Sequence, residues 1–133
     1  MTNEDVTAKN TPSIEAAECR LSVHSFSEQL LDQEIFFHVT KMTDSFVLWI
    51  GKKPATLKNF AVAISTKFDS EPSSSMLMGE VTDVQPTTLA QKIAKSTGKQ
   101  VFVSCNLPMA DPLMLSLVEK RLTEEMKANP DKF

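Results

Sequence analysis

Apolar residues occupy both faces of two consecutive predicted strands. The segment 35–50 reads IFFHVTKMTDSFVLWI, and its two runs of aromatic and β-branched residues flank Thr43-Asp44, a pair typical of a turn. A hairpin that turns there has one purely hydrophobic face, formed by Val39 opposite Leu48 and Phe37 opposite Ile50. Its other face is mixed, with Thr40 opposite Val47 and His38 opposite Trp49. A strand that is apolar on both faces needs a cover on both.

Alternation of polar and apolar residues predicts a strand before this hairpin. Leu21 and Val23 alternate with Ser22 and His24, which indicates a half-buried or edge strand. The folded part is therefore expected to begin near Arg20. Residues 1–19 are polar and are expected to form a disordered tail, and residues 20–133 a single domain.

Another long strand is predicted over residues 57–68. One side of it carries the large apolar residues Phe60, Val62 and Ile64, and the other side carries Ala61 and Ala63. Small residues on one side of a strand allow a helix to approach closely. A loop is expected at 69–75, followed by a short strand at 76–78.

Capping and helix-terminating residues mark the ends of two predicted helices. The first is expected over 86–98, with Thr87 as N-cap, an apolar stripe of Leu89, Ile93 and Ala94, and Gly98 at its end. A strand follows over 100–107. The last helix is expected to begin at Pro112 after an Asp111 cap and to end at Asn129-Pro130. Its apolar residues recur at helical spacing: Leu115, Val118, Leu122 and Met126.

These elements predict an α+β fold: a mostly antiparallel sheet of five or six strands with two helices on one face. Such a sheet is about 25 to 29 Å wide at ~4.8 Å per strand. Two helices of ~10 Å diameter cover about 20 Å, which suffices for one face only. The mixed face is left with an apolar patch larger than monomers usually expose. We therefore expect this face to stack on the sheet of a partner, unless the sheet curls on itself or a long loop crosses it.

Aromatic residues favoured in interface cores identify the expected partner-binding face. Its members are Phe36, His38, Val47 and Trp49, with Phe102 beside them. Lys52, Lys53 and Lys58 form a sparse basic stretch next to it, which we call the basic rim. This rim is either a solvated border or a surface that attracts an acidic partner.

Composition excludes several classes of function. The net charge of −3 gives no general case for nucleic acid or an anionic membrane as a partner, and no apolar run approaches the length of a membrane span. The N-terminus lacks the layout of a signal or transit peptide, so a cytoplasmic protein is expected, with the nucleus also open. The three glycines are too far apart for a nucleotide-binding loop. We expect no cofactor, no metal and no catalytic residues.

A thiol enzyme is the one catalytic alternative. Cys105 would pair with His38 or His24, and Asp44 would orient the imidazole. The simpler interpretation is that Cys105 packs as a small hydrophobic residue. No electropositive context marks this cysteine as reactive.

The same residues resemble the proteasome assembly chaperone 4 family over nearly all of the folded part. The resemblance is carried, in order, by SVHSF (22–26), FHV (37–39), TDSFVLWIG (43–51), LKNFAVA (57–63), FDS (68–70), LAQKIAKSTGKQVFVSCNL (89–107) and VEKRLTEEMKANPDKF (118–133). Two departures are the longer N-terminal tail and Cys105 at a position where an aromatic residue is expected.

The resemblance implies a non-enzymatic chaperone that pairs with a related chaperone, the third of the series. The heterodimer would promote assembly of the 20S proteasome α-subunit ring and leave before the particle is complete. A homodimer in the absence of the partner is also expected. Other assembly chaperones use a C-terminal hydrophobic-Tyr-X tail, which is not expected here because the chain has no tyrosine. The alternative is a small cytosolic adaptor with a profilin-like or longin-like sheet.

Overall fold

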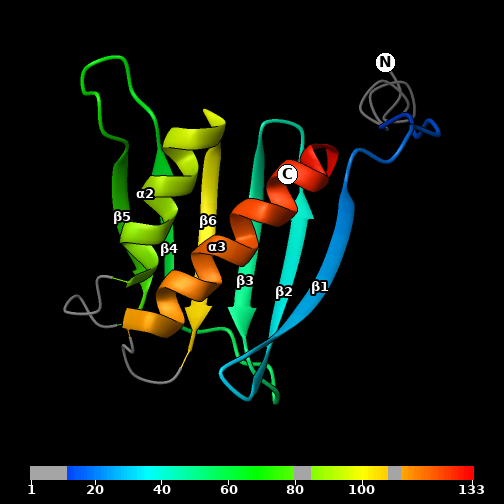
Figure 1. The fold of residues 1–133 in the computed structure, drawn as a ribbon. Coiled ribbons are helices and arrows are strands. Elements are labelled where there is room, and N and C mark those ends of the chain that lie inside the picture. Colours follow the sequence, from blue (N-terminus) through cyan, green and yellow to red (C-terminus); the bar gives the residue numbers. More distant parts are fainter. Residues whose placement is uncertain (1–11, 80–84, 108–111) are drawn as a thin grey trace, which may run out of the picture.

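A computed structural model describes residues 12–79, 85–107 and 112–133. One sheet and two helices make up the described chain (Figure 1). The elements are β1 (Ser22–Leu30), β2 (Gln33–Lys41), β3 (Ser45–Gly51), β4 (Phe60–Ile64), β5 (Ser73–Met78), α2 (Gln85–Thr97), β6 (Gln100–Asn106), α3 (Pro112–Ala128) and the 3-10 turn η1 (Pro130–Lys132).

The six strands form a single open sheet in the order β1-β2-β3-β6-β4-β5. All neighbours are antiparallel except β3 and β6, which are parallel. The predicted α+β class and mostly antiparallel sheet are confirmed. Because β1 and β5 remain at opposite edges, the sheet is not curled on itself.

The hairpin of β2 and β3 has the predicted register. Val39 lies opposite Leu48, and His38 lies opposite Trp49. The remaining pairs follow the same register: Phe37 with Ile50 and Thr40 with Val47. The hydrophobic face of this hairpin is buried under the helices, whereas the mixed face is not.

Strand β1 is longer than predicted, and its inward face is the opposite one. His24, Phe26 and Leu30 point towards the helices, whereas Val23 points away and is 61% exposed. A two-residue turn at Leu31-Asp32, with both residues at positive φ, joins β1 to β2. It sets a register in which the Phe26 ring stacks on Phe37 at 4.6 Å between centroids.

The strand expected over 57–68 is only five residues long. Its alternation was predicted correctly: Ala61 and Ala63 are fully buried on the helix side, where α2 packs over β4. The loop expected at 69–75 ends early, because Ser73–Met78 pairs with β4 as β5.

Helix α2 ends where predicted. Gly98 adopts a φ of 69° and donates its N–H to the Ala94 carbonyl at 2.9 Å. The predicted N-cap was wrong, since Thr87 lies inside the helix. Leu89 and Ile93 are buried, as their spacing indicated.

Helix α3 begins at Pro112 as predicted, while Asp111 lies outside the described residues. Its buried face consists of Met114, Val118, Leu122 and Glu125, so it is rotated relative to the predicted stripe, and Leu115 and Met126 are only half-buried. Both helices lie on the same side of the sheet (Figure 1). Their apolar residues share one core with the inward residues of the strands.

The last described residue completes this core. Phe133 is 3% exposed and meets Phe46 edge-on at 5.7 Å. Lys99 Nζ donates to the Phe133 main-chain oxygen at 2.5 Å. The segment after α3 is therefore fixed against the sheet.

Candidate interaction surface

The side of the sheet away from the helices is lined by apolar and aromatic residues; we call it the open face. Paired residues of neighbouring strands point to the same side, so the register defines its members. They include Val23 and Ser25 of β1, Phe36 and His38 of β2, Val47 and Trp49 of β3, Phe102 of β6, and Phe60, Val62 and Ile64 of β4. None of these ten residues is buried. In the described chain, neither helix covers this face.

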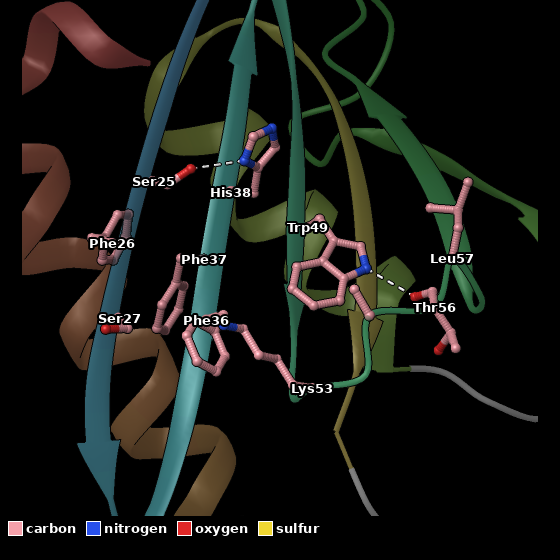
Figure 2. Close-up of a pocket in the computed structure, with 11 residues that line it drawn as sticks. Ser25, Phe26, Ser27, Phe36, Phe37, His38, Trp49, Lys53, Thr56 and Leu57 are labelled. Atoms are coloured by element: carbon pink, nitrogen blue, oxygen red, sulfur yellow. Dashed lines mark hydrogen bonds between the residues drawn. The ribbon is translucent and has the colours of Figure 1, made fainter.

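A groove of about 610 Å³ crosses one half of the open face (Figure 2). The strands β1 to β3 form its floor, and the loop 52–59 that follows β3 forms one wall. Phe36, Trp49 and Leu57 give it an apolar lining. Polar groups are few: Ser25 Oγ is hydrogen-bonded to His38 Nδ1 at 2.8 Å on the floor.

Trp49 holds this wall in place. Its indole N–H donates to the Thr56 carbonyl at 2.9 Å (Figure 2). The ring lies over Gly51, where an added Cβ would come within 2.7 Å of it. Further along the loop, the Ser104 hydroxyl donates to the Lys58 carbonyl at 2.6 Å. The loop thus borders the open face without covering it, in contrast to the alternative of a loop folded across the sheet.

The structure brings the four predicted partner-binding residues together. Phe36 and His38 lie on β2, and Val47 and Trp49 lie on the adjacent β3, all on the open face. Sequence reasoning missed the contribution of β4, whose Phe60 ring stacks on Phe102 at 5.9 Å. The alternation in β4 was visible, but its place beside β6 was not.

The basic rim lies at the end of β3, beside the groove. The Lys53 ammonium sits 4.8 Å from the centre of the Phe36 ring. Within the described ranges, none of Lys52, Lys53 and Lys58 forms an ion pair. The loop therefore presents, next to an apolar surface, three cations that have no ion-pair partner among the described residues.

The thiol-enzyme alternative is contradicted by the geometry. Cys105 is buried on the helix side of β6, whereas His38 lies on the open face. His24 does point to the helix side, but it lies on the edge strand β1 and is bonded to Glu125. Cys105 is thus not brought together with either histidine, and it is part of the core.

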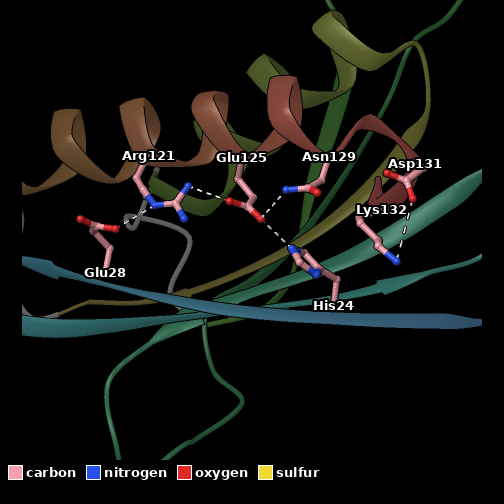
Figure 3. Close-up of polar contacts among 7 residues, drawn as sticks. All are labelled: His24, Glu28, Arg121, Glu125, Asn129, Asp131 and Lys132. Carbon is pink, nitrogen blue, oxygen red and sulfur yellow. Dashed lines mark hydrogen bonds and ion pairs between the residues drawn. The ribbon is translucent and has the colours of Figure 1, made fainter.

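The helix side contains a polar cluster that sequence reasoning missed (Figure 3). The Glu125 carboxylate accepts hydrogen bonds from His24 Nε2 at 2.7 Å, from Arg121 at 2.8 Å and from Asn129 at 3.0 Å. Arg121 also donates to Glu28 of β1 at 2.9 Å. The hydrogen bond from His24, followed by that from Arg121, lowers the pKa of Glu125 despite its burial. The cluster thus connects α3 to β1.

No group of three or more His, Cys, Asp or Glu residues in the described part of the chain is arranged to hold a metal ion. Across these same residues, no helix is long and apolar enough to cross a membrane. The clearest surface feature is therefore the open face with its basic rim.

Comparison with known proteins agrees with the sequence resemblance. Residues 34–107, more than half of the chain, match the family model described as proteasome assembly chaperone 4. Human proteasome assembly chaperone 4 is 48% identical over 113 residues, which cover 85% of this chain and 91% of the human protein. The mouse protein of the same name is 45% identical over 118 residues, which cover 89% of this chain and 95% of the mouse protein. The chain belongs to the proteasome assembly chaperone 4 family.

A solved structure supports the fold of this family member. The match is to a chain in a crystal structure described as a novel chaperone complex for yeast 20S proteasome assembly. The TM-score is 0.54 at 18% identity, and the match covers 82% of this chain and 95% of the yeast chain. Members of the proteasome assembly chaperone 4 family are assembly chaperones, so this chain is not an enzyme.

Proposed function

We propose that the chain acts as one half of a heterodimer with a related assembly chaperone, the third of the series. The heterodimer promotes assembly of the 20S proteasome α-subunit ring in the cytoplasm, and also in the nucleus, and is released before the particle is complete. The observation that carries this proposal is the open face, because it displays aromatic side chains on a sheet whose other side packs against both helices.

The open face has the composition of an interface core. A lone apolar side chain on a surface needs no explanation, but a contiguous patch across several strands marks an interaction site. Here the patch runs from Val23 on the edge strand β1 to Ile64 on β4. Stacking on the sheet of a partner would cover it, with the helices of both partners outside. In the absence of that partner, two copies would pair more weakly through the same face.

The residues proposed to carry partner binding are Phe36, His38, Val47 and Trp49. Trp49 is the strongest candidate because large aromatic residues at the centre of an interface contribute most of its binding energy. The chaperone would then act by position: it covers an α-subunit surface that would otherwise mispair, and an arriving subunit displaces it. Release by competition requires no nucleotide.

Two experiments test this proposal. A tagged pull-down from native cytosol, analysed by mass spectrometry, should recover free α-subunits and one small companion protein without mature β-subunits. Trafficking or cytoskeletal proteins without proteasome subunits would instead support the adaptor alternative. In the second experiment, Trp49→Ala should weaken dimerisation by more than ~2 kcal/mol. The fully exposed Phe68→Ala is the control, and an unchanged dimer affinity in folded Trp49→Ala would contradict the assignment.

A further inference from the structure

The basic rim is held in a fixed position beside the open face. Trp49 bonds the loop at Thr56, and Ser104 bonds it at Lys58. Lys53 and Thr56 line both the apolar groove and a second, polar groove of about 410 Å³ that also contains Lys52 and Lys58. A partner that covers the open face therefore also meets these cations.

The strands contribute few carboxylates to the open face beside the basic rim. Among the six described strands, Glu34 is the one acidic residue whose register places it on the open face. Three rim lysines thus lie beside a face on which the strands contribute one carboxylate, in a chain whose overall charge is −3. Glu34 lies at the same end of the sheet as the rim but forms no ion pair with it in the described chain.

Several acidic side chains on the helix side are paired with basic residues. Glu119 pairs with Lys92 at 3.0 Å, and Glu28 and Glu125 pair with Arg121. The lysines of the rim thus differ from Lys92, Lys95 and Arg121, each of which lies within ion-pair distance of a carboxylate.

This distribution of charge affects a homodimer and a heterodimer through the open face differently. In a symmetric homodimer the same surface occurs on both copies, so two cationic faces approach each other. Like charges brought together oppose association, whereas complementary charges favour it and steer the encounter. The apolar residues would favour either pairing, so the discrimination has to come from the charged groups.

We propose that the basic rim selects a related chain that carries carboxylates opposite it, and disfavours a second copy of this chain. The inference deepens the proposed function and rests on the assignment of the open face as the dimer face. The occupant is the sheet of a related chaperone with an acidic border. The rim thereby acts as the specificity determinant of the interface.

Self-association of the isolated chain tests the repulsive half of this proposal. Lys52→Ala/Lys58→Ala removes two rim cations and leaves Lys53 on the Phe36 ring. Lys120→Ala/Lys127→Ala removes two exposed cations of α3 on the other side of the sheet and is the matched control. Sedimentation equilibrium at low salt should show the rim variant dimerising about threefold to tenfold more tightly than wild type. The control should be unchanged, and raising the salt should reduce the difference.

A charge-reversed copy tests the attractive half. The variant Lys52→Glu/Lys58→Glu serves as an acidic surrogate partner of the same shape, and native mass spectrometry of its mixture with wild type uniformly labelled with nitrogen-15 counts each dimer. Mixed dimers in excess of the statistical fraction, decreasing with salt, support the proposal. A rim variant that dimerises no better than wild type, or a statistical mixture, overturns it. Trp49→Ala tests the assignment of the open face separately from the role of the rim. If the Trp49→Ala variant still dimerises, the open face is not the dimer face, regardless of the result for the rim variants.

Discussion

The contact between α3 and β1 can be tested through Glu125. Its side chain is 10% exposed and accepts hydrogen bonds from His24, Arg121 and Asn129. Removing one partner from a fully buried ion pair costs about 3–5 kcal/mol. The cost should be smaller here, because Arg121 is less buried and retains its ion pair with Glu28. Hydrogen bonds to charged groups contribute about 1.5–3 kcal/mol. We therefore expect Glu125→Gln to lower the free energy of unfolding by about 2–3 kcal/mol at pH 7.

The pH dependence gives this prediction a definite sign. The pKa of Glu125 is lowered in the folded state, chiefly by the hydrogen bond from His24. A carboxyl of this kind stabilises the fold fully above its unfolded pKa, near 4.5, and the contribution is lost as the pH falls through the lower folded value. The difference between wild type and Glu125→Gln should therefore shrink as the pH falls below about 4.5.

Urea denaturation at one fixed protein concentration provides the assay. The control is Glu124→Gln, which removes the same charge from the exposed neighbour on α3 and should change stability by less than about 0.5 kcal/mol. If Glu125→Gln were as stable as this control at pH 7, or if its deficit were the same at pH 3.5 as at pH 7, the carboxylate would not be a stabilising acceptor.

Three further substitutions test other parts of the fold. Phe133→Ala should lower the free energy of unfolding in urea by about 3–5 kcal/mol, whereas Phe68→Ala, at an exposed position, should be nearly neutral. Equal effects would mean that Phe133 is not packed in the core. Gly51→Ala should displace the indole of Trp49, the single tryptophan, and red-shift its fluorescence; an unshifted spectrum would contradict the close approach. Ala63→Leu should cost about 1–3 kcal/mol in thermal unfolding because α2 leaves no room for it, and a neutral result would argue against that packing.

Local chemistry explains which parts of the fold were predictable. The register of the central hairpin follows from the Thr43-Asp44 turn and from apolar residues on both faces. In β1, Val23 and Phe26 lie on opposite faces of the strand. Each face carries enough apolar residues to be the one that packs against the helices. The choice depends on the stacking of Phe26 on Phe37, a contact that only the β1–β2 turn creates.

Non-local contacts limited the prediction of the site. Phe36 to Trp49 could be placed because they lie in one hairpin, and the basic rim follows directly in sequence. The addition of Phe60 to the open face depends on β6 inserting between β3 and β4, a pairing with no sequence signal. Glu125 is 101 residues from His24, so its role could not be recognised from the apolar pattern of α3.

The two sides of the sheet are coupled through β1. As an edge strand, β1 is bonded to one neighbouring strand only, so α3 and η1 supply the rest of its support. His24 is held by Glu125 on the helix side, while the next residue, Ser25, bonds His38 on the open face. Because successive residues of a strand point to opposite sides, a contact that fixes His24 also fixes Ser25. The polar cluster under α3 therefore preorganises the β1 border of the surface that we propose for partner binding.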